Sequence, residues 1–160
     1  MTVRRALVTG GAGFIGSHVA EALAAGGYDV TAVDDLSTGR RQNLVAGIRL
    51  EELDIRTPDA ARLVQGGGFD VVCHLAAQID VRKSVADPVG DASRNILGTL
   101  NLLEAARQAP RPPRFIFSST GGAVYGDFVD PPSDEAQPKD PESPYGIAKL
   151  AVEYYLAYFG

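Results

Sequence analysis

Several features that would point to a function are scarce in this sequence. Its 160 residues include one cysteine (Cys73), two histidines (His18 and His74) and no tryptophan. A single cysteine excludes a disulfide within the chain. Since Cys73 also lies in an apolar run, we expect a reducing compartment, the cytoplasm. No group of Cys, His and carboxylate residues has the spacing of metal ligands, so we expect no metal and structural roles for both histidines.

The sequence also lacks an excess of positive charge and long apolar runs. The formal net charge of −5 argues against a nucleic-acid partner. The apolar runs are too short to cross a bilayer, and the N-terminus shows no signal-peptide pattern. Hydrophobic residues make up 45% of the chain and charged residues 22%, as in globular proteins. The length predicts one domain, residues 1–160, with a core of its own.

Strand and helix patterns alternate along the chain. Strands are expected at residues 6–8, 29–33, 48–53, 70–75 and 114–117, and helices after Gly13, Thr57, Pro88 and Ser143. This alternation predicts an α/β fold with a doubly wound parallel sheet in the order 3-2-1-4-5. In such a sheet the ligand crevice lies at the carboxyl ends of strands one and four.

Three of the helices carry an apolar stripe, and one segment has neither pattern. We expect the stripes to face the core; their members are Phe14, Ile15, Val19, Ala22 and Leu23, then Ile96, Leu97, Leu100, Leu103 and Ala106, then Ile147, Leu150, Ala151, Tyr154 and Tyr158. Residues 121–144, rich in Pro, Asp and Gly, are predicted to form a long loop. A loop of that length in a compact domain is usually functional.

A glycine-rich turn follows the first strand. Gly10, Gly13 and Gly16 are spaced so that the chain can turn tightly and enter a helix, and Gly11–Gly16 also fits G-x-G-x-x-G. Backbone N–H groups at the start of that helix can then bind a phosphate. The same pattern also occurs in ordinary strand-to-helix turns, so the residues that follow decide between the two.

An acidic residue ends the second strand. Asp34 lies 18 residues beyond Gly16, close to the spacing at which a carboxylate accepts the ribose hydroxyls of a dinucleotide. A carboxylate there also repels a 2′-phosphate, so we predict NAD rather than NADP. Arg40 and Arg41 are near enough in sequence to leave NADP as the alternative.

Tyr145 and Lys149 are four residues apart on the last predicted helix, so their side chains share a face. An ammonium about 4 Å away could lower the pKa of a tyrosine by about 3, enough for acid–base work near neutral pH. A bound oxidised nicotinamide would add a second positive charge. Thr120, at the end of the fifth strand, could hydrogen-bond a substrate oxygen, or it could simply terminate that strand.

Seven motifs in this order resemble those of the extended short-chain dehydrogenase/reductase family, the NAD-dependent epimerases and dehydratases. They are TGGAGFIGSH (Thr9–His18), VDDLSTG (Val33–Gly39), Asp54-Ile55, HLAAQ (His74–Gln78), Asn95 followed by GTLNLLEA, SSTGGAVYG (Ser118–Gly126) and SPYGIAK (Ser143–Lys149). The UDP-glucose 4-epimerase branch is the most similar. The resemblance covers essentially the whole chain.

The resemblance implies a role for each matching residue. The catalytic residues it implies are Thr120, Tyr145 and Lys149. It assigns cofactor binding to Gly10, Gly13, Phe14, Ile15, Gly16, Asp34, Asp35, Ser37, Thr38, Gly39, Asp54, Ile55, Leu75, Ala76, Ala77, Gln78, Asn95, Ser118, Tyr145 and Lys149. By this resemblance Asp34 holds the adenosine ribose, Asp54 and Ile55 flank the adenine, and Lys149 reaches the nicotinamide ribose.

The implied activity is epimerisation of a nucleotide-sugar, a UDP-hexose, at C4 through a transient 4-keto sugar with NAD as cofactor. Sugar dehydratases of the family carry an Asp-Glu pair after the catalytic threonine, whereas Gly121 and Gly122 follow Thr120 here. Family members continue into further strands and a C-terminal substrate lobe, whereas this sequence stops at Gly160. We therefore expect the cofactor-binding part of such an enzyme, either a fragment or a truncated relative. A nucleotide-sugar decarboxylase, a reductase and a non-catalytic NAD-binding module remain alternatives.

The missing strands also predict how the chain associates. Strand five would become an edge strand with an apolar run, Phe115 to Phe117, suited to burial on both faces. The last helix would expose part of its surface formed by Tyr154, Tyr155, Tyr158 and Phe159. We therefore expect a homodimer or another self-association, and poor turnover by the 160-residue chain alone.

Overall fold

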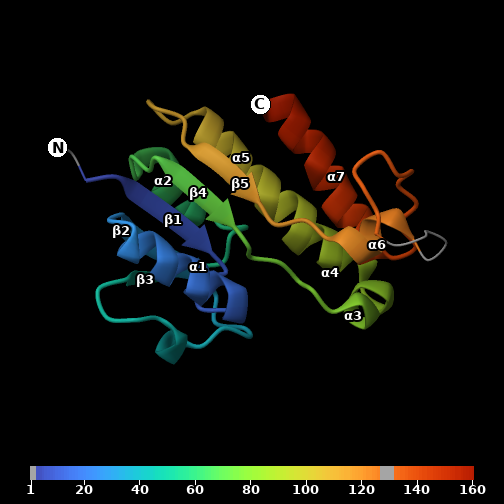
Figure 1. Ribbon diagram of the computed structural model, residues 1–160, viewed down its shortest axis with the longest axis horizontal. Coiled ribbons are helices and arrows are strands. Elements are labelled where there is room, and N and C mark those ends of the chain that lie inside the picture. Colours follow the sequence, from blue (N-terminus) through green and yellow to red (C-terminus); the bar gives the residue numbers. More distant parts are fainter. Residues whose placement is uncertain (1–2, 127–131) are drawn as a thin grey trace. The chain divides into compact units, whose positions relative to one another are not determined.

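A computed structural model describes residues 3–126 and 132–160. The chain divides into two compact units: Met1–Ala77 with Asn101–Ser118, and Gln78–Leu100 with Ser119–Gly160. Figure 1 labels the helices and strands of both units. The single domain over residues 1–160 stays a prediction.

The first unit is built on a parallel sheet of five strands. They are β1 (Arg5–Thr9), β2 (Asp29–Asp34), β3 (Arg49–Glu52), β4 (Val71–His74) and β5 (Arg114–Phe117). Their order is β3-β2-β1-β4-β5 (Figure 1), which confirms the predicted doubly wound topology. In the register of the sheet, Thr9 at the end of β1 is paired with Val33 on one side and His74 on the other. The carboxyl ends of β1, β2 and β4 therefore meet at one edge.

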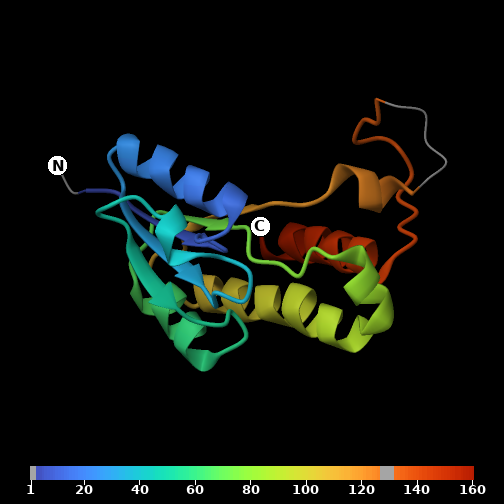
Figure 2. The same cartoon turned by 90° about the horizontal axis from the view of Figure 1, so that it is seen from below.

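Helices cover both faces of this sheet (Figure 2). The helix α1 (Phe14–Ala25) packs with Ala6 and Val8 on one face. The helix α2 (Pro58–Gly66) and the second half of α5 (Gly98–Arg107) pack with Leu7 on the other. Successive residues of a strand point to opposite faces, so β1 contributes to both cores. A short 3₁₀ helix, η1 (Arg41–Asn43), lies in the loop after β2.

The second unit is helical within the described residues. It contains α3 (Val81–Ala86), α4 (Pro88–Ala92), the π-helical segment η2 (Ser93–Leu97), the first turn of α5, α6 (Gly121–Tyr125) and α7 (Pro144–Phe159). The predicted helix after Pro88 is present as α4, η2 and α5. The sequence analysis missed α3, which Asp80 caps through the N–H groups of Arg82 and Lys83.

Two helix starts confirm the Ser/Thr-Pro signal. Thr57 caps α2 by accepting from the N–H of Ala60, and Ser143 caps α7 by accepting from the N–H of Gly146. In both helices proline occupies the first helical position, where no backbone donor is needed.

The loop predicted for residues 121–144 is wrong at its start. Gly121–Tyr125 form α6, and Thr120 is its N-cap. A threonine at an N-cap can offset the low helix propensity of the two glycines that follow. Residues 127–131 of the predicted loop lie outside the described residues.

The predicted apolar stripes are wrong in part. Phe14 and Ile15 of α1, Leu97 of η2, and Ile147, Tyr154 and Tyr158 of α7 are exposed, whereas Leu103 and Ala106 of α5 are buried as expected. The core-facing residues of α7 are instead Gly146, Ala148, Lys149 and Val152. The π segment adds a residue to its turn, so positions beyond it shift and Leu102 is buried. None of the described helices combines the length and apolar character needed to cross a membrane.

Candidate nucleotide-binding and catalytic sites

The glycine turn at the end of β1 is closely packed. Gly10 has a φ of +65°, and a Cβ there would lie 2.8 Å from the backbone nitrogen of Ala76. A Cβ on Gly16, in the first turn of α1, would overlap the carbonyl oxygen of Gly10. Glycine at position 10 therefore lets the turn approach the chain just after β4, and glycine at position 16 lets α1 approach the turn.

The first turn of α1 suits an anion. Gly13 is its N-cap and has no side chain, so no capping side chain accepts from the N–H groups of this turn. Such N–H groups, at the positive end of a helix, bind phosphates. The exposed Phe14 and Ile15 lie in the same turn. This geometry fits the pyrophosphate of a dinucleotide.

Asp34 lies beside this turn. It is 8% exposed, and its Oδ2 accepts from the N–H of Ala12 at 3.0 Å while Oδ1 accepts from the N–H of Leu36 at 2.9 Å. A carboxylate has about four lone-pair sites, so two bonds leave capacity for ribose hydroxyls. Gly39 approaches so closely that a Cβ there would lie 2.6 Å from Oδ1 of Asp34.

The loop after Asp34 is held to the glycine turn through Ala12. The carbonyl oxygen of Ala12 accepts from the N–H of Arg40 at 2.9 Å and from Nδ2 of Asn43 at 2.8 Å. Sequence reasoning missed Asn43, because a lone Asn in a polar loop carries no motif. Arg41, one of the two cations that left NADP open, is paired with Glu52 at 3.0 Å.

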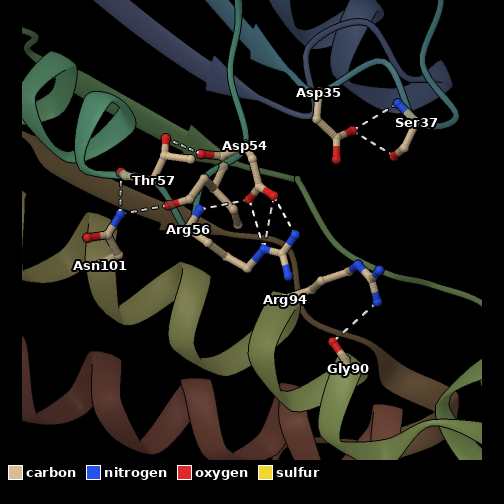
Figure 3. Close-up of polar contacts among 9 residues, drawn as sticks. Asp35, Ser37, Asp54, Arg56, Thr57, Gly90, Arg94 and Asn101 are labelled. Carbon is tan, nitrogen blue, oxygen red and sulfur yellow. Dashed lines mark hydrogen bonds and ion pairs between the residues drawn. The ribbon is translucent and has the colours of Figure 1, made fainter.

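The predicted cofactor residues Asp35, Ser37, Thr38 and Gly39 all belong to this loop. Oδ1 of Asp35 accepts from both the N–H and the hydroxyl of Ser37, at 2.9 and 2.6 Å (Figure 3). Asp35, Ser37 and Thr38 are exposed. This exposure leaves their polar groups accessible to a ligand.

Asp54, Arg56, Thr57 and Asn101 form a second polar cluster (Figure 3). The carboxylate of Asp54 accepts from the backbone and guanidinium of Arg56, including Nη2 at 2.5 Å. That hydrogen bond raises the pKa of Arg56, and the negative charges of Asp54 and Asp35 add to it. Nδ2 of Asn101 donates to the carbonyl oxygens of Ile55 and Thr57 at 2.7 and 3.0 Å. Asn101 therefore fixes the backbone of this loop, a role that its place in an amphipathic helix did not signal.

Thr9 fixes the end of β4. Its Oγ1 lies 2.6 Å from Nδ1 of the buried His74 and accepts from the N–H groups of Leu75 and Ala76, both at 3.2 Å. His74 thus has the structural role expected from the sequence. The bonds set the course of Leu75, Ala76 and Ala77, three of the predicted cofactor residues.

In the second unit, Asn95 holds the main chain of Gln78. Nδ2 of Asn95 donates to the carbonyl oxygen of Gln78 at 2.9 Å, and its Oδ1 accepts from the N–H of Gln78 at 2.8 Å. Asn95 is 3% exposed and lies in the π segment η2. π turns inside helices occur frequently at functional sites.

Tyr145 and Lys149 share one side of α7. Nζ of Lys149 lies 5.8 Å from the centre of the Tyr145 ring, and Lys149 is 4% exposed. Burial lowers the pKa of Lys149 to about 8, against an opposing effect of the negative charge of Asp91. Burial also raises the pKa of Tyr145, and the charge of Asp91 adds to this rise. The pKa of Tyr145 is thus raised in the described chain, opposite to the fall expected from Lys149.

Thr120 has a structural bond of its own. Its Oγ1 accepts from the N–H of Ala123 at 3.5 Å as the cap of α6, and its side chain is half-buried. The neighbouring Ser118 is exposed, and Ser119 donates to Oε1 of Glu153 on α7. A long cap bond leaves the hydroxyl of Thr120 able to donate to another group. Among the described residues, no group of three or more Cys, His, Asp and Glu side chains could hold a metal ion.

The sheet order, the glycine turn at the end of β1 and the carboxylate at the end of β2 define a Rossmann-like α/β protein of the dinucleotide-binding type. The family model of the NAD dependent epimerase/dehydratase family matches residues 6–160. The chain belongs to this family, whose cofactor is NAD.

The relatives and solved structures are consistent with that assignment. The chain is 45% identical to a putative UDP-glucose 4-epimerase of Methanocaldococcus jannaschii, over 94% of this chain and 49% of the relative. Its structure resembles that of a Thermotoga maritima UDP-glucose 4-epimerase with UDP-glucose, with a TM-score of 0.91 and 45% identity over 97% of this chain and 50% of that one. A Thermus thermophilus UDP-glucose 4-epimerase in complex with NAD gives the same score and identity, over 98% and 50%. The chain thus spans about half the length of these relatives.

Proposed function

We propose that this chain is the NAD-binding part of a nucleotide-sugar 4-epimerase acting on UDP-hexoses of the UDP-glucose and UDP-galactose type. The observation that supports this most is the pair Tyr145 and Lys149 on one side of α7, in a chain 45% identical to a UDP-glucose 4-epimerase structure. The same proposal places the protein in galactose metabolism in the cytoplasm, as a homodimer.

The glycine turn, Asp34 and the loop at Asp54 are the residues that we propose to hold NAD. The first turn of α1 would bind the pyrophosphate, Asp34 the adenosine ribose, and the Asp54–Ile55 loop the adenine. The nicotinamide side would be lined by residues 75–77, which follow β4, and by Gln78, which Asn95 holds in place. Lys149 would donate to the nicotinamide ribose.

Bound NAD supplies the acceptor and then the donor of a hydride at the sugar C4, and its oxidised ring carries a positive charge. Tyr145, as phenolate, would take the proton of the 4-hydroxyl and later return it, so that a 4-keto sugar forms transiently. The raised pKa of Tyr145 in the described chain means that the phenol keeps its proton until a positive charge offsets burial and Asp91. Thr120 would bind the same sugar oxygen through its hydroxyl, and Lys149 would stabilise the phenolate.

Conversion of UDP-galactose to UDP-glucose by the NAD-loaded chain tests the proposal. We expect slow turnover that Tyr145→Phe abolishes while NAD affinity stays nearly unchanged, because the variant loses the ionisable hydroxyl and keeps the ring. Tyr154→Phe, on the exposed side of the same helix, is the matched control and should have no effect.

Other outcomes would favour the alternatives. Release of CO₂ from a UDP-uronic acid would indicate a decarboxylase, and net reduction or oxidation of a sugar would indicate a reductase. NAD binding without reaction of any nucleotide-sugar would favour a non-catalytic NAD-binding module. Turnover retained in Tyr145→Phe would remove Tyr145 from the mechanism.

A further inference from the structure

Asp91 is a buried carboxylate that none of the motifs includes. It lies in α4 and is 2% exposed. Leaving an ionisable group in such a place costs free energy unless other groups compensate for it. The groups around Asp91 therefore indicate what it does.

One oxygen of Asp91 binds the two amides of the candidate site. Oδ1 accepts from Nδ2 of Asn95 at 2.9 Å and from Nε2 of Gln78 at 3.0 Å. The same Nδ2 of Asn95 also donates to the carbonyl oxygen of Gln78, so the three residues form one hydrogen-bonded cluster. Asp91 thus orients both side chains.

The other oxygen has no hydrogen-bond partner. Oδ2 of Asp91 is fully buried and unpaired, which is rare for a carboxylate oxygen. The helix α4 packs against α7, and Figure 2 shows the two side by side. Lys149, on the buried side of α7, is a cation that can compensate for this charge.

The charged groups near Asp91 come from three elements packed together with α4. From α7, Tyr145 and Lys149 both interact electrostatically with Asp91. Arg82 and Lys83 of α3 and Arg94 of η2 are exposed, so solvent screens their charges. The buried ammonium of Lys149 is therefore the cation most affected by Asp91.

We propose that Asp91 is a positioning residue of the site, whose buried carboxylate keeps the ammonium of Lys149 charged and holds Gln78 and Asn95 in place. Lys149 needs its charge to stabilise a phenolate and to bind a ribose, and burial alone works against that charge. Asp91 opposes the effect of burial on Lys149. The same negative charge adds to the effect of burial in raising the pKa of Tyr145.

The pKa values of Lys149 and Tyr145 test this role without any need for catalysis. The sequence contains three lysines, Lys83, Lys139 and Lys149, so isotope-labelled lysine gives a simple NMR titration, and labelled tyrosine reports Tyr145. In Asp91→Asn, which keeps the shape and the acceptor, we expect the pKa of Lys149 to fall below about 8. We expect the pKa of Tyr145 to fall as well, because a negative charge beside it is gone.

The two shifts together separate charge from structure. A variant that merely loosened the packing would admit water, which raises the pKa of Lys149 while it lowers that of Tyr145. A rise at Lys149, or no change at either residue, would overturn the proposal. Asp134→Asn, which removes an exposed carboxylate and keeps an acceptor for the N–H of Ala136, is the matched control. Asp91→Ser provides the same comparison if Asp91→Asn does not fold.

The effect of Asp91 on turnover rests on the proposed function, whereas the titration does not. If the chain is an epimerase, Asp91→Asn should lower its turnover rate, whereas Asp134→Asn should leave that rate unchanged. Absence of turnover in the unmutated chain would count against the proposed function alone. A wrong direction of the Lys149 shift would count against the role of Asp91 alone.

Discussion

The side chain of Asn95 binds both main-chain groups of Gln78. Its Oδ1 accepts from the N–H at 2.8 Å, and its Nδ2 donates to the carbonyl oxygen at 2.9 Å. A side-chain amide is the one neutral group that can donate and accept in this way with a single planar unit. The pairing fixes the chain at the point where it leaves β4 and begins the helical unit.

Replacing Asn95 with Ala should therefore destabilise the fold. The variant leaves the main-chain groups of Gln78 and one bond of Asp91 without a partner, a loss of about 2–3 kcal/mol. Urea unfolding measures the change, and hydrogen exchange at the Gln78 amide should become faster. Arg94→Ala, at the neighbouring exposed position, is the control, and an equal loss in both variants would contradict the prediction.

Asp34 should determine the choice between NAD and NADP. Its carboxylate can accept ribose hydroxyls and repels a 2′-phosphate, so NAD should bind more tightly than NADP. Asp34→Asn keeps the acceptor for Leu36, removes the charge, and should weaken NAD binding about tenfold or more while narrowing the gap to NADP. Calorimetry with both nucleotides tests this, with Asp134→Asn, at an exposed carboxylate outside the proposed site, as the control. Equal affinities in the unmutated chain would contradict the assignment.

The stability of the chain should depend on pH through Lys149. Burial lowers the pKa of Lys149 from 10.5 to about 8, so the folded chain loses this proton before the unfolded chain does. Between these pH values the unfolded chain binds more protons, and the free energy of unfolding therefore rises with pH. The cost of the buried ammonium, about 3 kcal/mol, is fully present below the lower value and absent above the upper one.

Lys149→Met should remove this pH dependence. At pH values below about 8 the variant should be more stable than the unmutated chain, because it carries no buried ammonium. This difference in the free energy of unfolding should disappear as the pH rises from about 8 to 10.5. Lys139→Met, at an exposed lysine, should leave the slope unchanged. Parallel curves for all three proteins would show that Lys149 titrates normally.

The outer edge of β5 should promote self-association of the 160-residue chain. In the described sheet β5 pairs with β4 alone, and Ile116 on β5 is exposed, in line with the expectation from the sequence. Ile116→Lys places a charge on this edge and should shift sedimentation towards the monomer. Val45→Lys adds the same charge at an exposed apolar position outside the strands. A monomeric unmutated chain would contradict the prediction.

The sequence was sufficient to predict the sheet and the glycine turn after β1, because both depend on local signals. Short apolar runs, the glycines near Gly10 and the caps Thr57 and Ser143 each specify structure within a few residues. Parallel connections then restrict the strand order.

Other features depend on contacts that periodicity does not encode. An apolar stripe does not say which side of a helix meets the core, so α7 buries Lys149 and exposes Tyr154. The π segment at Asn95 shifts the apolar periodicity of the helix, and no single residue type predicts such a segment. Asp91 was missed because the role proposed for it depends on its burial beside α7, which follows from tertiary packing.

The thiol of Cys73 allows local unfolding of the sheet to be measured. Cys73 lies buried within β4, between β1 and β5, and burial raises its pKa. Alkylation or oxidation requires a thiolate that reagents can reach, so Cys73 should react mainly when the strands separate. Its labelling rate is then the opening equilibrium multiplied by the rate for a free thiol. Because the helical unit has no cysteine, the labelling rate of Cys73 reports opening of the sheet unit alone. A ligand that binds at the carboxyl ends of the strands should lower this rate.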